Sequence, residues 1–309
     1  MTTMRALIGG SGSPELIEAP TPQAGRGQVR IKVAAAGLNP FDLAVASGSL
    51  SDYGVARELD SYGLGFDAAG AVDQVGEGVA IAPGQEVIAL VGRLELPTKA
   101  QADHVVVDAS AVAPAPAGLS PVEAATLPLN TLTAWQALDR ANLSQGRTVL
   151  VTGAAGAVGG FAVELAAARG LRVVAAAGGD DEELVRGFGA EWFVPRGEDL
   201  GEAVRKRVPG GVDAVIDAAV TGLAGLNALR DGGTFVTLTA GVAPVALRGT
   251  DVATVFFREE PFQLAEIARL AGLGRLTARV AGTYPLEQAG DAYARLAKGG
   301  LRGRLVLTL

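Results

Sequence analysis

The chain of 309 residues is 49% hydrophobic and 19% charged, with a formal net charge of −7. This length and composition predict a globular protein of about two domains and exclude a disordered chain. A negative chain without a Lys/Arg-rich run is unsuited to a phosphate backbone, so we expect no nucleic-acid partner. The N-terminus lacks the layout of a signal peptide, and the apolar stretch 149–168 is interrupted by glycines and Glu164. We therefore expect a cytoplasmic protein with no membrane partner.

Metal chemistry is limited by the donor residues that the chain lacks. There is no cysteine, and His104 is the one histidine. A catalytic zinc ion takes about three protein ligands, usually including His or Cys. We therefore expect no zinc, and no acidic cluster suggests another metal.

Residues 1–115 are predicted to be rich in β-strands, because short apolar runs alternate with Pro, Gly and Asp. The predicted strands are 29–33, 69–75, 86–91 and 104–107. A helix is expected to begin after Ser120, since Pro121 suits its first position and Glu123 completes a capping box.

From residue 148 onward, strands and helices are predicted to alternate. The strands are 148–152, 172–176, 192–194, 212–217, 234–238 and 252–257. The helices are 157–169, 181–188, 200–207, 222–230 and 261–273. Continuously apolar strands between helices indicate a parallel sheet covered on both faces. The last strand, 303–309, is expected to return to the first domain.

The stretch 149–159 carries the main chemical signal. A buried strand runs into a glycine turn, Gly153-x-x-Gly156-x-x-Gly159, and then into an apolar helix. Glycines let the backbone approach a pyrophosphate, and the helix N-terminus supplies free N–H groups. Ala154 departs from the strict glycine fingerprint. The predicted cofactor-binding residues of this turn are Gly153, Ala154, Ala155, Gly156, Ala157, Val158 and Gly159.

An acidic residue that holds a ribose hydroxyl is expected near the end of the second strand of this unit. Asp180 and Asp181 lie there, after Gly178. They would accept from a ribose and repel a 2′-phosphate, or else they cap the next helix.

Five separated motifs occur in order along nearly the whole chain. They are residues 33–42 (VAAAGLNPFD), 65–70 (GFDAAG) with 75–79 (VGEGV), 123–135 (EAATLPLNTLTAW), the glycine turn, and 302–307 (RGRLVL). Together they resemble the zinc-free quinone oxidoreductases, the ζ-crystallin-like group of the medium-chain dehydrogenase/reductase superfamily.

The resemblance implies an α/β fold with two domains. A GroES-like β-rich catalytic domain is expected from residues 1–115 and 274–309. A Rossmann domain with a doubly wound parallel sheet is expected from residues 116–273. Zinc-containing relatives carry a Cys and a His-Glu pair where this chain has Asn39, Phe66 and Asp67.

The resemblance also implies site residues. Asn39 and Thr133 match polar positions near the nicotinamide, although Asn39 could instead be a turn residue and Thr133 could bond its own helix. Asp42 is expected to order its loop. Some relatives have a Tyr and an Arg where Ala44 and Ala46 stand, which leaves the proton donor open. Further cofactor contacts are expected at Gly178, Asp180, Thr239 and Arg304.

The implied function is metal-independent hydride transfer from NADPH or NADH to a quinone or α,β-unsaturated carbonyl. The alternatives are an enoyl-type reductase for a dedicated biosynthetic intermediate and a non-catalytic nucleotide-binding redox sensor. The choice between the nucleotides is open, because Asp180 disfavours a 2′-phosphate whereas Arg186 or Arg196 could reach it. The substrate is a small molecule, and its pocket depends on loops 47–62 and 239–250. A homodimer is expected through the sheet edge at 252–257.

Overall fold

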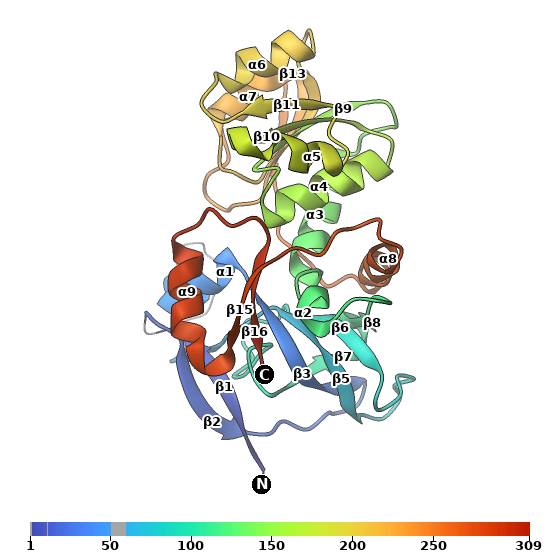
Figure 1. Cartoon of the computed structure of the whole chain (residues 1–309), viewed down its shortest axis with the longest axis vertical. Coiled ribbons are helices and arrows are strands. Elements are labelled where there is room, and N and C mark those ends of the chain that lie inside the picture. The colour runs from blue at the N-terminus through green and yellow to red at the C-terminus, as the bar shows by residue number, and fades with distance from the viewer. Residues whose placement is uncertain (1, 11, 51–59) are drawn as a thin grey trace. The chain divides into compact units, whose positions relative to one another are not determined.

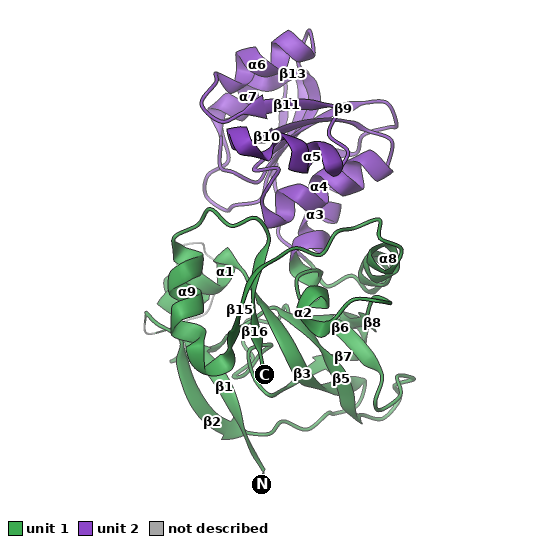
Figure 2. Ribbon diagram, viewed as in Figure 1, with its two compact units in different colours: residues 1–129, 258–309 green, residues 130–257 purple. Residues whose placement is uncertain are grey.

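The computed structural model describes residues 2–10, 12–50 and 60–309 (Figure 1). The chain divides into two compact units: residues 1–129 and 258–309 form unit 1, and residues 130–257 form unit 2 (Figure 2). Most of the expected pocket loop 47–62, namely 51–59, lies outside the described residues. Unit 1 is rich in β-strands and unit 2 contains a parallel sheet covered by helices, so the predicted α/β class is confirmed.

Among its described residues, unit 1 contains two sheets, one of three strands in the order β2-β1-β4 and one of seven strands in the order β15-β16-β3-β5-β6-β8, with β7 paired to β3. Its strands are β1 (Thr3–Gly9), β2 (Glu15–Pro20), β3 (Gln28–Leu38), β4 (Tyr62–Gly63), β5 (Asp67–Val75), β6 (Glu86–Leu90), β7 (His104–Asp108), β8 (Val112–Pro114), β15 (Val280–Pro285) and β16 (Arg304–Thr308). Its helices are α1 (Pro40–Ser47), α2 (Pro121–Ala124), α8 (Pro261–Gly272) and α9 (Ala289–Ala297). The C-terminal strand β16 pairs antiparallel with β3, so both ends of the chain contribute to this sheet.

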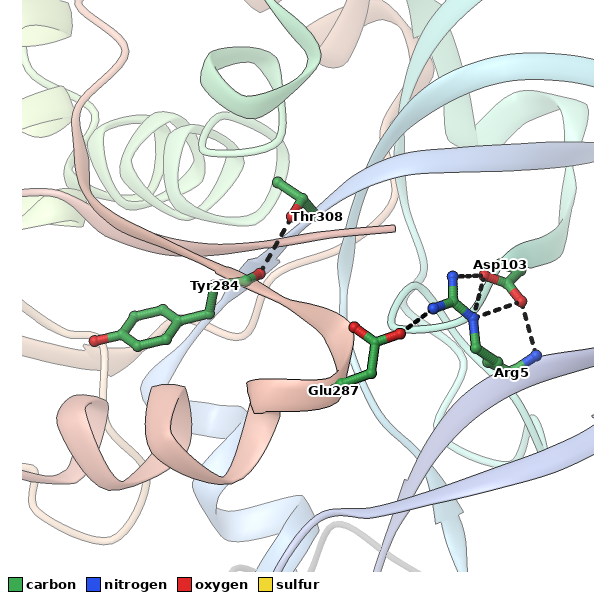
Figure 3. A network of polar contacts seen from close by, with 5 residues as sticks. All are labelled: Arg5, Asp103, Tyr284, Glu287 and Thr308. Carbon is green, nitrogen blue, oxygen red and sulfur yellow. Dashed lines mark hydrogen bonds and ion pairs between the residues drawn. The ribbon is translucent and has the colours of Figure 1, made fainter.

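Polar contacts tie segments of unit 1 that are far apart in the sequence (Figure 3). Arg5 on β1 donates to Asp103 at 2.7 Å and also pairs with Glu287, just before α9. The hydroxyl of Thr308 donates to the carbonyl oxygen of Tyr284 at 3.4 Å, which links β16 to β15. Because the Arg5 side chain is 42% exposed, these ion pairs orient the segments more than they stabilise the fold.

Unit 2 contains a six-stranded sheet in the order β11-β10-β9-β12-β13-β14, and every neighbouring pair is parallel. Its strands are β9 (Thr148–Thr152), β10 (Arg172–Ala177), β11 (Trp192–Pro195), β12 (Val212–Asp217), β13 (Leu229–Thr237) and β14 (Asp251–Thr254). Its helices are α4 (Ala157–Ala168), α5 (Glu182–Gly187), α6 (Leu200–Arg207) and α7 (Leu223–Ala228), together with residues 130–141 of α3 (Pro128–Ala141). The strand order reverses between β9 and β12, which makes that pair the topological switch point.

The core of unit 2 explains why its strands were recognisable in the sequence. All five residues of β9 are buried, as are the apolar residues of β12. One cluster packs Leu150, Val174, Val215 and Phe235 from four neighbouring strands. Strands covered by helices on both faces carry continuous apolar runs, and that pattern had predicted them.

The units divide at 129/130 and 257/258, whereas the sequence predicted 115/116 and 273/274. The difference arises because α2 packs on β3 and β5, and α8 packs on β8, so both helices belong to unit 1. An amphipathic pattern shows that a helix buries one face but not which sheet it covers.

Candidate functional site

The glycine turn of unit 2 is built by backbone contacts too close for larger residues. Gly153 follows β9 with a φ of +60°, a conformation that glycine adopts without strain. A Cβ added to Gly159 would lie 2.1 Å from the carbonyl oxygen of Gly153. Gly156 caps α4 without any side-chain hydrogen bond at the cap position. The first turn of α4 therefore presents backbone N–H groups where β9 ends, an arrangement that suits a pyrophosphate.

The other predicted cofactor residues of unit 2 lie at the same sheet edge, because the carboxyl ends of parallel strands share one edge. Gly178 and Asp180 follow β10, and Asp180 is exposed. Asp181 is buried and accepts from the backbone N–H of Gly178 at 3.1 Å, so it orders this turn. Thr239 follows β13, and its N–H donates to the Thr237 hydroxyl at 3.3 Å.

Asp217, which sequence reasoning left without a role, organises the loop at the switch point. Its carboxylate is 1% exposed and accepts from the Thr152 hydroxyl at 2.6 Å. It also accepts from the backbone N–H groups of Thr221 and Gly222 at 2.9 and 3.1 Å. The Thr152 hydroxyl in turn accepts from the N–H of Ala219 at 3.2 Å. The signal in the sequence was an aspartate that ends the strand directly after the apolar run 214–216.

Unit 1 contains a second polar group around Asn39. Asn39 precedes α1 and is 1% exposed, and its side-chain Nδ2 donates to Asp67 at 2.6 Å. The other Asp67 oxygen accepts from the backbone N–H of Leu129 at 2.6 Å. Asp42 accepts from the N–H of Asn39 at 2.7 Å and from that of Gly65 at 3.1 Å. Asp42 thus orders its loop, as expected, and Asp67 orients the Asn39 amide.

Buried cations accompany these carboxylates. The Nζ of Lys99 lies 3.2 Å from the centre of the Phe66 ring, and the Phe66 and Phe41 rings are 5.2 Å apart. Arg304, at the start of β16, is 7% exposed and faces the charges of Asp67 and Asp42. Sequence reasoning missed Lys99, because no pattern places it beside Phe66.

Burial dominates the titration of this cluster. It raises the pKa of Asp67 to about 6, against the hydrogen bonds from Leu129 and Asn39 and the positive charges of Arg304 and Lys99. Burial also raises the pKa of Asp42 and lowers that of Lys99, while their attraction acts in the opposite direction on both. The pKa of Arg304 is lowered to about 10 by burial. The carboxyl groups of Asp42 and Asp67 and the amine of Lys99 therefore gain or lose protons near neutral pH.

The predicted site residues are divided between the two units. Gly153 to Gly159, Gly178, Asp180, Thr239 and Thr133 belong to unit 2, and Asn39 and Arg304 to unit 1. Thr133 is half-buried on α3. The structure brings together the residues of the sheet edge in unit 2, and Asn39 with Arg304 around Asp67 in unit 1.

In residues 2–10, 12–50 and 60–309, no three His, Cys, Asp or Glu side chains gather in a way that could hold a metal ion. Nor does any helix in them combine the length and hydropathy needed to cross a bilayer. The Nε2 of His104 lies 3.4 Å from a carboxylate oxygen of Asp73, and the His104 side chain is partly exposed.

The glycine turn allows a direct test. Gly159→Ala places a methyl group against the Gly153 carbonyl, so the turn must shift and nucleotide affinity should fall at least about 100-fold. Calorimetric titration with NADPH and NADH measures this. Gly187→Ala in α5 is the matched control, since an added Cβ there meets nothing within 4 Å among the described residues and should leave affinity unchanged. Unchanged binding to the Gly159→Ala variant would refute the phosphate cradle.

Comparison with known families gives two matches. Residues 25–117 match the alcohol dehydrogenase GroES-like domain, and residues 188–307 match a family described as zinc-binding dehydrogenase. The mitochondrial NAD(P)H oxidoreductase RTN4IP1 of Mus musculus is 30% identical, covering 91% of this chain and 82% of that protein. The 2-methylene-furan-3-one reductase of Solanum lycopersicum is 30% identical, covering 91% and 71%. The polyketide synthase protein NorB of Streptomyces orinoci is 35% identical over 98% of this chain, which spans 14% of its length.

Solved structures share the whole fold. The quinone oxidoreductase from Coxiella burnetii superposes with a TM-score of 0.87 at 27% identity, with 100% of both chains covered. An alcohol dehydrogenase superfamily protein from Novosphingobium aromaticivorans gives a TM-score of 0.89 at 29% identity, again over 100% of both chains. These matches confirm the resemblance found in the motifs. The chain belongs to the medium-chain dehydrogenase/reductase superfamily, in the group of the quinone oxidoreductases.

Proposed function

We propose that this chain is an NAD(P)H-dependent oxidoreductase that reduces quinones or α,β-unsaturated carbonyls without a metal ion. The observation that carries the proposal is the glycine turn at the switch point of a parallel sheet, where a Cβ on Gly159 would fill the space that the Gly153 carbonyl occupies. Relatives named as a quinone oxidoreductase, an alkenal/one oxidoreductase and a furanone reductase support the choice of substrate class.

The cofactor would be held by unit 2. The turn from Gly153 to Gly159 would hold the pyrophosphate, Gly178 and Asp180 would contact the adenosine ribose, and Thr239 would lie along the same edge. When bound, the nicotinamide supplies a hydride, which is the reducing chemistry that no amino-acid side chain provides. Arg304 of unit 1, whose buried guanidinium faces Asp67, is a further proposed contact to the cofactor.

The substrate side would be served by amide and hydroxyl donors. Negative charge builds on the substrate oxygen as the carbon accepts a hydride, and a preorganised donor stabilises that charge. Asn39 offers an amide whose orientation is set by Asp67, and Thr133 offers a hydroxyl. With Ala44 and Ala46 on α1, that helix offers no acid at these two places, so we propose that solvent supplies the proton.

The donor set argues for metal independence. The three places at which zinc-containing relatives carry ligands hold an asparagine amide, a phenyl ring and the Asp67 carboxylate. The phenyl ring of Phe66 has no lone pair for zinc, and a single carboxylate does not make a zinc site. The residues present therefore fit charge stabilisation by hydrogen bonds better than by a metal.

One observation favours a second candidate function. NorB and the polyketide synthase component PikAII of Streptomyces venezuelae are 35% and 31% identical over almost all of this chain, which spans 14% and 8% of their lengths. A segment of this size within a synthase is expected to act on a biosynthetic intermediate. The second candidate is therefore an enoyl-type reductase with a dedicated substrate.

Steady-state oxidation of NADPH and NADH with a panel of quinones, small enones and enoyl thioesters tests these functions. We expect turnover with quinones or enones and no change after dialysis against a chelator. Turnover confined to enoyl thioesters would favour the second candidate. Tight nucleotide binding without any turnover would instead indicate a redox sensor, and loss of activity on chelation would overturn metal independence.

Nucleotide preference is expected to depend on Asp180. Asp180→Ser removes a negative charge from the end of β10, so the ratio of kcat/KM for NADPH to that for NADH should rise roughly tenfold. Arg196 is exposed, and its backbone N–H donates to the carbonyl oxygen of Ala177, the last residue of β10, at 2.7 Å. Since its positive charge would favour a 2′-phosphate, Arg196→Ala should lower the same ratio. Glu183→Ser, an equal charge change farther along α5, is the control. An equal response to Asp180→Ser and Glu183→Ser would contradict a ribose contact at Asp180.

We further propose that the protein is a homodimer formed through β14. This strand is one of the two edges of the parallel sheet, and Phe256 beyond it is 56% exposed. Light scattering on the purified chain should give twice the monomer mass, and Phe256→Glu should shift the equilibrium toward monomer by placing a charge in the apolar contact. A monomeric wild-type protein at micromolar concentration would count against the dimer.

A further inference from the structure

Lys99 carries a buried positive charge that none of the steps above uses. Its side chain is 1% exposed, and its Nζ lies 3.2 Å from the centre of the Phe66 ring. Across the part of the chain that the structure describes, no hydrogen-bond acceptor contacts this Nζ. A buried ammonium without an acceptor is costly, so other charges must compensate for it.

Carboxylates from four parts of unit 1 face Lys99. They are Asp42 on α1, Asp67 on β5, and Glu95 and Glu259 from loops. Glu259 is already held by the backbone N–H of Gly92 at 2.7 Å. Asp42 and Asp67 are the fully buried members, and an isolated buried carboxylate would tend to take up a proton.

Asp67 is the member of this group that contacts the proposed catalytic amide. Its two oxygens accept from Asn39 Nδ2 and from the Leu129 N–H, both at 2.6 Å. Hydrogen bonds to a carboxylate are strongest while it is charged. The charges that face Asp67 are the cations of Lys99 and Arg304 and the carboxylate of Asp42. A proton on Asp67 would remove the charge that orients the Asn39 side chain.

We propose that Lys99 is a positioning residue for the reaction: its ammonium keeps Asp67 ionised, and ionised Asp67 holds the Asn39 amide toward the substrate oxygen. This inference rests on the proposed function, which gives Asn39 its contact with substrate. Lys99 itself touches neither substrate nor cofactor. The Phe66 ring, which lies against the ammonium, provides a cation–π contact in place of a hydrogen-bond acceptor.

The titration of the cluster sets the pH range in which this role is visible. With its pKa raised to about 6, Asp67 is ionised at pH 7 and loses its charge as the pH falls through 6. Arg304 and, to a smaller extent, Lys99 are the cations that lower this pKa, so removal of Lys99 raises the pKa further. With its pKa raised above 7, Asp67 would be mostly protonated at pH 7 and would ionise only in more alkaline solution.

A carbon-13 NMR titration of labelled aspartate carboxyls tests the charge coupling independently of activity. The Asp67 resonance is assigned by its loss in Asp67→Asn. In Lys99→Met its midpoint should move from near pH 6 to above pH 7, whereas Lys99→Arg, which keeps the charge, should hold it near the wild-type value. An unmoved midpoint in Lys99→Met overturns the proposal.

Kinetics test the consequence for Asn39. Lys99→Met should lower kcat/KM at pH 7 at least about twofold relative to wild type, since less than half of Asp67 is ionised once its pKa exceeds 7, and kcat/KM should recover as the pH rises to 9. Lys99→Arg should restore the wild-type profile. Lys206→Met, on the exposed side of α6, is the control for losing a lysine charge. A pH-independent loss in Lys99→Met would indicate packing alone and overturn the positioning role.

A double variant controls for misfolding of the single variant. Asp67→Asn with Lys99→Met removes one buried charge of each sign, so it should fold at least as well as Asp67→Asn and turn over no more slowly. A further loss in the double variant would contradict a role acting through Asp67. If wild type turned over no acceptor, the proposed function would fail, while the NMR titration would still decide whether Lys99 controls Asp67.

Discussion

The approach of Gly159 to the carbonyl oxygen of Gly153 is the constraint on which the fold of unit 2 at its glycine turn depends. A methyl group at residue 159 would lie 2.1 Å from that oxygen, so the first turn of α4 packs against the end of β9 only because the side chain is absent. This contact directs the N-terminus of α4 to the sheet edge where the paired strands β9 and β12 end. Asp217 and Thr152 then fix the neighbouring loop by hydrogen bonds to its backbone. A rigid backbone surface at a helix N-terminus suits a diphosphate, because its donors need no reorganisation on binding.

In the β-rich unit 1, polar groups are buried inside an otherwise apolar sheet structure. Asn39, Asp42 and Asp67 are almost completely buried, and the carboxylate oxygens of the two aspartates accept from backbone N–H groups or from the Asn39 amide. Charge is balanced by Lys99 and Arg304. Buried charges of both signs stabilise one another only in a defined geometry, so such a cluster orients its members. If the reaction runs without a metal, as we propose, such an environment can hold an amide donor oriented toward a developing oxyanion.

The two units would therefore contribute different kinds of interaction to the proposed reaction. Unit 2 offers backbone dipoles and small residues, which suit the constant part of a nucleotide. Unit 1 offers oriented side chains, whose protonation responds to pH near neutrality because burial raises the pKa values of its carboxyls. The GroES-like match, residues 25–117, lies within unit 1, whereas the dehydrogenase match, residues 188–307, spans parts of both units.

The sequence by itself determined the α/β class, the strands β9 and β12 to the residue, the capping box at Ser120 and the position of the glycine turn. These features are local: periodicity, capping residues and glycine spacing act over a few neighbouring residues. Tertiary structure alone decided which sheet α2 and α8 cover, that Asp217 bonds Thr152, and that Lys99 lies on Phe66 beside Asp67. These contacts join residues far apart in the chain, and no period or spacing encodes them, because they depend on how packed elements bring side chains together and on the burial that then shifts their charges.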